Sequence, residues 1–251
     1  MYLNVKGLTI YYEKYGNSQD IILILPGWGN TRETFNYIVN SLKENNTIYI
    51  LDYPGLGNSP NPNKTLTIYD YTELIIEFMK KLNINNPTII AHSFGGRITT
   101  LLCGYYHIKV NKLILIDIAG IKKKQTIKTT IYKTLKKLLN IFPKKYRTKL
   151  KNILFQKFAS TDYLNLPPTM HQTFKNIINE DLKKYYKNIQ EETIIIWGEL
   201  DNDTPLKDGK KINKSIKNSA LIVLQNANHF SYLTYPLLTV NIIKCFIKKE
   251  H

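Results

Sequence analysis

A serine followed by two glycines lies in the most informative stretch of the sequence, residues 88–97. A β-branched apolar run leads into Ser93, and Gly95 and Gly96 open a helix-like segment. Small residues around a serine at a strand-to-helix turn let the backbone bend sharply and lift the hydroxyl above the sheet edge. The dipole of the following helix favours negative charge that develops there. Ser93 is therefore the candidate nucleophile, with Ala91 where such turns usually carry glycine.

A serine hydroxyl needs a base to attack at neutral pH, and five histidines compete for that role. His229 follows a strand-like run and a short loop, so it can reach over the sheet and is the predicted base. His92 adjoins the serine but points elsewhere on so tight a turn, and His171 lies in a helical region where it can touch substrate. We therefore expect His92 to be a structural or pocket-lining residue, and assign it with His171 to substrate binding. His107 follows a helix and His251 ends the chain, so neither suits a base.

The acid that orients the histidine is expected between serine and histidine in chain order. Asp201 leaves a strand-end turn at Gly198 and is preferred. Asp203 precedes Thr-Pro and fits a turn or a helix cap better. Asp117, at the end of an earlier strand, is a second rival. Whichever residue serves, the acid keeps the imidazole in the right tautomer and stabilises its charged form.

Acyl transfer also needs donors for an oxyanion, and residues 25–30, Leu-Pro-Gly-Trp-Gly-Asn, supply a candidate loop. Gly27 and Gly29 allow backbone N–H groups to approach a ligand, so we assign both to substrate binding. The backbone N–H groups of Trp28 and Phe94 are the predicted donors. An ordinary strand-to-helix turn would also explain these two glycines.

Short β-branched runs alternate with segments of helical period, which predicts a mostly parallel sheet with helices on both faces. A Lys-Gly turn within the first fifteen residues indicates an antiparallel hairpin at the sheet edge. The fold class is therefore α/β, doubly wound. The predicted strands are residues 21–25, 47–51, 88–91, 113–117, 193–197 and 220–224, and one predicted helical face is Leu237, Leu238, Ile242 and Phe246.

Residues 119–190 interrupt this alternation, because they contain no convincing strand. Apolar residues at 127, 131, 135, 138 and 142 recur at helical spacing, and prolines at 143, 167 and 168 punctuate the region. A helical insertion between two strands is most simply a cap over the sheet ends. We therefore expect a single domain spanning residues 1–251 with a cap at 119–190.

With these motifs in order, the chain resembles the α/β-hydrolase superfamily of serine hydrolases. Residues 26–29 are similar to its His-Gly-x-Gly oxyanion loop, and residues 52–59 to its Asp-x-Pro-Gly-x-Gly-x-Ser loop. Residues 91–96 resemble its nucleophile elbow, residues 197–201 its acid turn, and residues 228–229 its histidine loop. The departures are Pro26 for histidine, and Ala91 and Asn228 for glycine; none of them removes a triad member.

The resemblance implies hydrolysis of a carboxylic ester or thioester through an acyl-enzyme, with Ser93, His229 and Asp201 as catalytic triad. A serine nucleophile argues against the haloalkane dehalogenases and epoxide hydrolases, which use aspartate. The Gly-Trp-Gly loop and helical cap resemble small carboxylesterases, including those that cleave methyl esters of carrier-bound acyl chains. A carbon–carbon bond hydrolase or cofactor-free perhydrolase with the same triad, and a non-catalytic ligand-binding protein, stay open as alternatives.

The charge is strongly basic, with 35 Lys and Arg against 19 acidic residues and a net of +16. Between Asp117 and Asp162 there are 13 basic residues and no acidic one, so the predicted cap is locally basic. A solvated lysine-rich face is one interpretation. The other is docking of an acidic carrier protein, coenzyme A or anionic lipid. Nucleic acid is not an expected partner, because no recognised binding module is present.

The remaining features favour a cytoplasmic protein without cofactor or metal. The two cysteines, Cys103 and Cys245, lack metal-ligand spacing and lie in helix-like stretches, so a disulfide is not expected. No apolar run approaches the ~18 residues that a membrane span needs, and the N-terminus lacks the pattern of a signal peptide. No ligand cluster or phosphate loop indicates a cofactor.

Overall fold

The computed structural model describes residues 1–30, 32–122 and 166–248. In this part of the chain eight strands form one sheet in the order β1-β2-β4-β3-β5-β6-β7-β8. The hairpin of β1 and β2 lies at one edge, and β2 runs antiparallel to β4. All other neighbouring strands are parallel, so the predicted sheet is confirmed. The strands are β1 (Tyr2–Val5), β2 (Leu8–Tyr15), β3 (Ile21–Leu25), β4 (Thr47–Asp52), β5 (Thr88–His92), β6 (Lys112–Ile116), β7 (Glu192–Gly198) and β8 (Ser219–Leu224).

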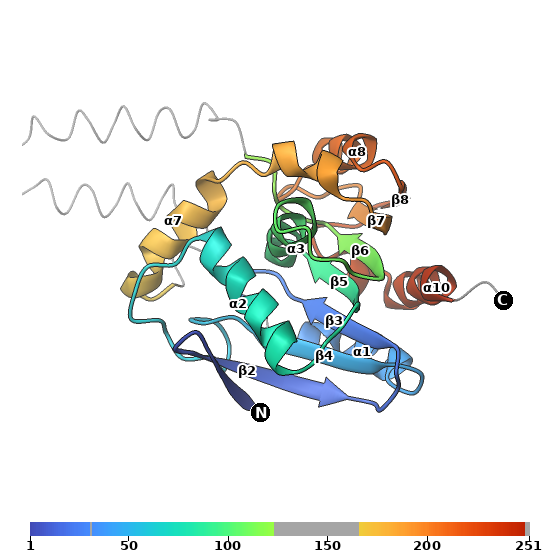
Figure 1. Cartoon of the computed structure of the whole chain (residues 1–251). Coiled ribbons are helices and arrows are strands. Elements are labelled where there is room, and N and C mark those ends of the chain that lie inside the picture. Colours follow the sequence, from blue (N-terminus) through green and yellow to red (C-terminus); the bar gives the residue numbers. More distant parts are fainter. Residues whose placement is uncertain (31, 123–165, 249–251) are drawn as a thin grey trace, which may run out of the picture.

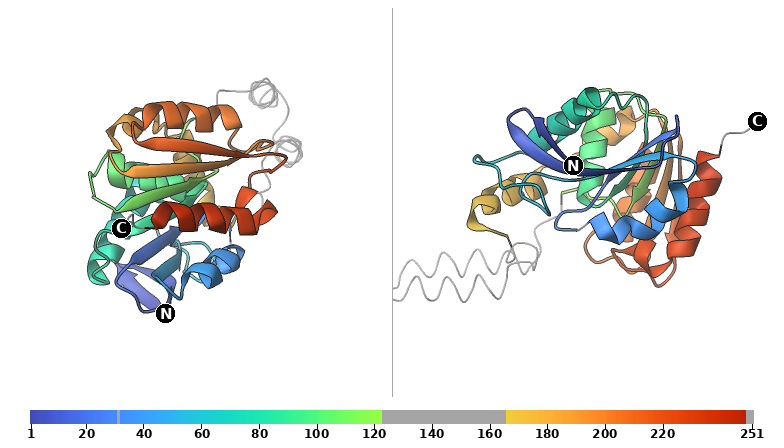
Figure 2. Two further views of the ribbon diagram at one scale, coloured as in Figure 1. Left: turned by 90° about the vertical axis from the view of Figure 1, so that its right-hand side faces the viewer. Right: turned by 90° about the horizontal axis from the view of Figure 1, so that it is seen from below.

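Helices cover both faces of the sheet (Figures 1 and 2). On one face lie α2 (Ile68–Lys81), α3 (Phe94–Gly104) and α8 (Leu206–Ser215), and on the other α1 (Asn36–Leu42) and α10 (Pro236–Ile247). The remaining helices of the described residues are η1 (Arg32–Phe35), η3 (Pro168–Met170), α7 (His171–Asn179), η4 (Lys183–Asn188) and α9 (Ser231–Thr234). This arrangement is the doubly wound architecture that the alternating apolar patterns predict.

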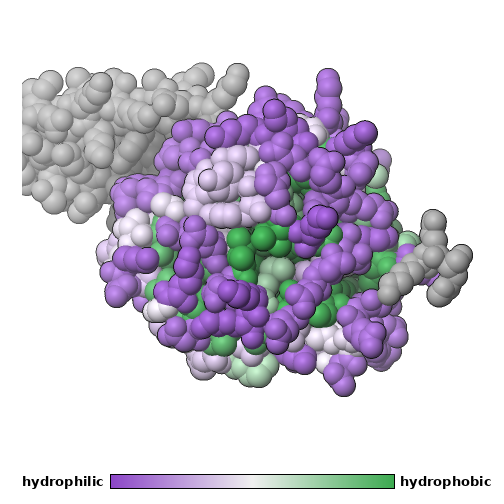
Figure 3. Space-filling model, viewed as in Figure 1, coloured by the Kyte–Doolittle hydropathy of each residue, from purple (hydrophilic) through white to green (hydrophobic). Residues whose placement is uncertain are grey.

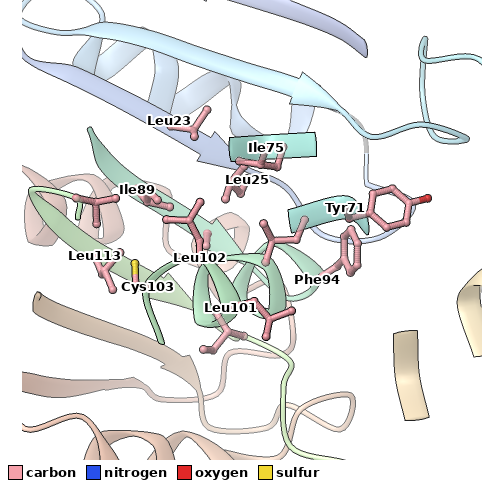
Figure 4. Packing of buried hydrophobic residues seen from close by; sticks show 14 of the residues in the cluster. Leu23, Leu25, Tyr71, Ile75, Ile89, Phe94, Leu101, Leu102, Cys103 and Leu113 are labelled. Carbon is pink, nitrogen blue, oxygen red and sulfur yellow. The ribbon is translucent and has the colours of Figure 1, made fainter. Parts of the chain in front are cut away.

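Two apolar cores follow from the two faces, because successive strand side chains point to opposite sides. Leu23 and Leu25 of β3 pack with α2 and α3, whereas Ile22 and Ile24 pack with α1 and α10. Figure 4 shows Leu25 and Phe94 packed with Tyr71 and Ile75 of α2 in the first core. The central strands are buried on both faces, which explains their unbroken β-branched runs.

Helix α3 is buried along its whole length. At its first turn it lies so close to the sheet that only residues without a side chain fit there. A Cβ on Gly95 would lie 2.0 Å from the carbonyl oxygen of Leu25, and one on Gly96 would lie 2.2 Å from the Cβ of Ile118. The two glycines therefore set the distance between α3 and the strands. Because Ser93 directly precedes α3, this close contact also fixes the position of Ser93.

The strand register brings the functional loops to one edge. Leu25 pairs with Ala91, His92 with Ile116, Ile116 with Ile196, and Gly198 with Leu224. The carboxyl ends of five parallel strands, β3, β5, β6, β7 and β8, therefore lie side by side. Ligands in open α/β sheets bind at this edge, where the loops after the strands meet.

The predicted α10 face is only partly right. Ile242 and Phe246 are half-buried and pack against the core, but Leu237 and Leu238 are 61% and 48% exposed, and Thr239, Val240 and Ile243 are buried in their place. The helix carries apolar residues at most of its positions, so its sequence pattern is compatible with several buried faces. Packing beside α1 decides which face is buried. The cap at 119–190 stays a prediction: most of it, residues 123–165, lies outside the described residues, including its apolar helical positions and most of its basic residues.

Hydrophilic side chains dominate the face shown in Figure 3, with smaller apolar areas near its centre. The lysines of α8, Lys207, Lys210, Lys211 and Lys214, are exposed. None of the helices in the described residues is long and apolar enough to span a membrane.

Replacing Gly95 with alanine should lower the free energy of unfolding by more than about 2 kcal/mol, because the new methyl group meets a backbone carbonyl that cannot move aside. Gly7→Ala is the matched control. Gly7 has a φ of +78° with nothing within 4 Å of the new Cβ, so only the backbone strain of about 1 kcal/mol is expected. Urea denaturation followed by tryptophan fluorescence measures both, and equal losses would contradict the close-approach argument.

Candidate active site

Ser93 lies between β5 and α3 with a φ of 46° and a ψ of −107°, a conformation that side-chain-bearing residues rarely adopt. Its N–H donates to the carbonyl of Ile116 (3.2 Å), and its carbonyl accepts from the N–H groups of Gly96 (3.0 Å) and Ala119 (2.9 Å). These three hydrogen bonds hold the strained turn in place. Such strain persists only where the surroundings over-determine it, and it is concentrated at functional sites.

The structure brings three of the predicted residues into one hydrogen-bonded chain. The Oγ of Ser93 lies 3.0 Å from Nε2 of His229, and Nδ1 of His229 lies 2.8 Å from Oδ2 of Asp201. Because an ionised carboxylate only accepts hydrogen bonds, Nδ1 carries the proton and Nε2 is left to accept from the serine hydroxyl. This tautomer is the one a general base needs.

Asp201 is held in place by the turn that follows β7. Its Oδ1 accepts from the backbone N–H groups of Asp203 (2.7 Å) and Thr204 (2.8 Å), and its Oδ2 accepts from the Thr204 hydroxyl (2.6 Å). That hydroxyl also lies 3.2 Å from Nδ1 of His229. Sequence reasoning missed Thr204 as a site residue. A threonine three positions after an aspartate in the turn that follows a strand was the available sign of a side-chain-capped turn.

The electrostatics of the pair favour opposite charges. Burial alone would lower the pKa of His229, but its hydrogen bond to Asp201 and the charge of that carboxylate outweigh burial and raise the pKa. Burial would likewise raise the pKa of Asp201, but the hydrogen bond and charge of His229, together with Thr204, lower it. The site is therefore built to stabilise an imidazolium beside a carboxylate.

The two rival acids take other places. The carboxylate of Asp117 accepts from Gly198 N–H (2.7 Å) and from the N–H (3.1 Å) and hydroxyl (2.6 Å) of Ser231, so it ties the end of β7 to α9. Asp203 is exposed and reaches Asp201 through its backbone N–H. Ser231, which sequence reasoning did not single out, is fully buried beside the histidine loop.

Asp201, Asp203 and His229 each offer a ligand atom, and these atoms lie within 4.8 Å of one another. Two of the three already bond to each other, and both oxygens of Asp201 accept hydrogen bonds from the turn. A metal ion at Nδ1 of His229 would replace the Asp201 contact that orients the ring. This chemistry suits a triad better than a cation site.

The predicted oxyanion loop faces the start of α3. The Gly95 N–H donates to the Pro26 carbonyl (3.1 Å), and the rings of Trp28 and Phe94 meet edge to face at 5.1 Å. Within the described part of the chain, the backbone N–H groups of Trp28 and Phe94 donate to no protein acceptor. Gly29 adopts a φ of +70°, a region that favours glycine.

Of the remaining predicted substrate-binding residues, Gly27 belongs to this loop, and His92 and the helix that begins at His171 lie beside it. Gly27 is buried, and a Cβ there would meet the side chain of Asn30 at 2.5 Å and the His92 ring at 2.7 Å. His92 is fully buried, with both ring nitrogens engaged inside the protein. His171 begins α7, whose Phe174 ring lies 5.4 Å from the Trp28 ring. Helix α7 therefore lies beside the oxyanion loop.

Comparisons with known proteins agree with the fold described above. A family model described as the alpha/beta hydrolase fold matches residues 20–236. The chain is 28% identical to the pimeloyl-[acyl-carrier protein] methyl ester esterase of Wigglesworthia glossinidia brevipalpis, over 95% of this chain and 98% of that protein. It is 23% identical to the 2-hydroxy-6-oxononadienedioate/2-hydroxy-6-oxononatrienedioate hydrolase 1 of Pseudomonas putida, over 89% of this chain and 86% of that one.

A solved structure shows the same fold. MGS-M2, an alpha/beta hydrolase enzyme from a Medee basin deep-sea metagenome library, superposes with a TM-score of 0.79 and 21% sequence identity. The match covers 100% of this chain and 98% of that one.

Asp117 should make stability depend on pH. Burial raises the pKa of this carboxyl to about 7, against hydrogen bonds from Ser231 and Gly198 that favour the charged form. A native pKa above the unfolded value means that the folded protein keeps a proton which the unfolded chain releases. The wild-type free energy of unfolding should therefore fall, relative to Asp117→Asn, as pH rises from about 4 to about 7, with a slope approaching 1.4 kcal/mol per pH unit. Urea denaturation across this range measures the difference, and a constant offset would contradict the assignment.

Proposed function

Because the chain belongs to the alpha/beta hydrolase family, and is an enzyme of that type, we propose that it is a serine hydrolase that cleaves a carboxylic ester or thioester. The observation that supports this most is the hydrogen-bonded chain from Ser93 through His229 to Asp201. The strained backbone of Ser93 and the unpaired N–H groups beside it add support within the described residues.

The proposed reaction has two halves. The Oγ of Ser93 attacks the substrate carbonyl while Nε2 of His229 takes its proton, and the tetrahedral oxyanion binds the N–H groups of Trp28 and Phe94. His229 then gives the proton to the departing alcohol or thiol, leaving an acyl-serine. Water, deprotonated by His229, attacks the acyl group, and collapse of the second intermediate releases the acid and returns the proton to Ser93.

Carrier-bound acyl esters are the substrate class that we propose first. The relative from Wigglesworthia is named for such a substrate and matches almost the whole of both chains. An acidic carrier protein or anionic lipid would suit the net charge of +16, although most of the basic run falls outside the described residues. We propose that the insertion at 119–190 serves as the cap that selects the substrate.

The second candidate is a carbon–carbon bond hydrolase. The Pseudomonas putida relative, whose name gives an unsaturated oxo diacid and no ester as its substrate, matches 89% of this chain. Turnover of a dienoate diacid but of no ester would favour it. Peroxide-dependent halogenation, assayed beside ester hydrolysis, identifies a perhydrolase. A non-catalytic binding protein would neither turn over substrate nor react at the serine.

Replacing Ser93 with alanine should abolish hydrolysis of a p-nitrophenyl ester series and labelling by a fluorophosphonate, because both need the Oγ nucleophile. The loss in kcat should reach about 10⁴-fold or more. Ser215→Ala, at a half-buried serine of α8 whose hydroxyl donates to the Lys211 carbonyl, is the matched control and should keep full activity. A wild type that neither turns over nor labels at Ser93 would refute the serine-hydrolase proposal.

Replacing Asp201 with asparagine should lower kcat by about 10³–10⁴-fold, because the orienting anion is lost. The pH profile gives a second readout. Activity needs neutral His229, whose pKa Asp201 raises, so the wild-type acid limb should lie above the ordinary value of 6.5. In the variant, burial dominates and the limb should move to lower pH.

Asp203→Asn is the control for this change, because that carboxylate acts on His229 only by charge. It should shift the limb slightly downward and lower kcat by less than about threefold. Equal effects from the two variants would argue against Asp201 as the acid.

A further inference from the structure

A second histidine lies beside the proposed base. His92 directly precedes Ser93, its side chain has no exposed surface, and its ring centroid lies 4.9 Å from that of His229. The rings of Phe230 and Tyr232 pack around it, at 5.4 and 5.0 Å. The reaction proposed above does not use this imidazole, although it is buried among the residues that do the chemistry.

Both nitrogens of His92 bond to loops that carry the proposed site. Nε2 lies 2.9 Å from the backbone carbonyl oxygen of His229, and Nδ1 lies 3.1 Å from the side-chain nitrogen of Asn30. A carbonyl only accepts, so Nε2 carries the proton, and Nδ1 then accepts from the Asn30 amide. Burial, followed by the charge of His229, lowers the pKa of His92 to about 3, so the ring stays neutral and this tautomer is kept.

These hydrogen bonds join loops that are far apart in the sequence. Asn30 ends the loop after β3 that carries Trp28, His92 ends β5, and His229 follows β8. The loop after β3 packs directly on the ring, because Gly27 has no Cβ and any Cβ there would lie 2.7 Å from Nδ1. We call the hydrogen bonds from Asn30 through His92 to the His229 carbonyl the interloop bridge.

We propose that the interloop bridge holds the His229 loop and the oxyanion loop at a fixed separation, so that base and oxyanion donors act on the same carbonyl group. His92 and Asn30 are then positioning residues that act through the backbone of His229 and Trp28. This inference rests on the proposed serine-hydrolase function. Misplacement by about 1 Å at a reacting group can cost about 10²-fold in rate, so the bridge matters for turnover more than for substrate binding.

The test replaces His92 with phenylalanine, which keeps the bulk of the ring and removes both hydrogen bonds. On p-nitrophenyl acetate kcat should fall by about 10–100-fold while KM changes by less than about twofold. The rate of fluorophosphonate labelling at Ser93 should fall in parallel. His92→Gln places an amide nitrogen near the position of Nε2 and should restore most of the loss, because it renews the donor to the His229 carbonyl.

Asn30→Ala is the second variant, and it leaves the buried ring in place should His92→Phe fail to fold. It should lower kcat less than His92→Phe does, because it removes only the Asn30–His92 hydrogen bond. The double variant should be no slower than His92→Phe alone, because His92→Phe already breaks the whole bridge. His107→Asn, at an exposed position with a φ of 55°, is the control and should keep wild-type kcat. Thermal unfolding of each variant identifies any loss caused by misfolding.

The outcomes separate the two proposals. An active wild type whose folded His92→Phe and Asn30→Ala variants keep kcat within about twofold would overturn the interloop bridge and leave the hydrolase proposal standing. A loss confined to KM would also overturn it, since His92 would then serve substrate binding. A wild type without Ser93-dependent turnover or labelling refutes the hydrolase proposal itself, and the role of the bridge with it.

Discussion

The strained turn at Ser93 is the constraint on which the rest of the site depends. Its φ of 46° is maintained because the N–H and carbonyl of the residue bond to Ile116, Gly96 and Ala119. Gly95, which has no side chain, lets the start of α3 lie so close to β3 that a Cβ there would collide with the Leu25 carbonyl. Strain of this kind costs on the order of 1–3 kcal/mol, and the buried helix and sheet hold it. The hydroxyl is thereby presented at the sheet edge, where loops from four other strands meet.

Two buried carboxylates near this edge, Asp201 and Asp117, have opposite pKa shifts because their surroundings differ. Asp201 faces a partner that can carry positive charge, and the pair lowers its pKa. Asp117 faces neutral donors on Gly198 and Ser231, so burial prevails and its pKa rises. The first arrangement suits orienting an imidazole, and the second suits joining β7 to α9 beneath the histidine loop. Like residues at neighbouring strand ends thus serve different purposes.

The parallel sheet explains why so few residues are needed to organise the site. Its register brings the ends of β3, β5, β7 and β8 together. Each loop therefore starts at a fixed position and contributes one or two functional groups to the site. What the register leaves free is the separation of the loops beyond the strands. Thr204, Ser231 and His92 each bond from one loop to another, and each lies within three positions of a residue of the proposed triad.

Local pattern alone determined the strands, the edge hairpin and the strand-to-helix turn at Ser93. These features depend on interactions between residues close in sequence, in the β-branched runs and in the serine two positions before a pair of glycines. Local pattern also placed His229 and Asp201 as candidates, and their roles stay proposals. It favoured Asp201 but left Asp203 and Asp117 open as rivals, since all three follow or adjoin strand ends, and only the fold shows which carboxylate meets the imidazole. The face of α10 and the partners of His92 were likewise decided by tertiary packing. Asn30, His92 and His229 are joined across 62 and 137 positions of sequence, and no local period records such contacts.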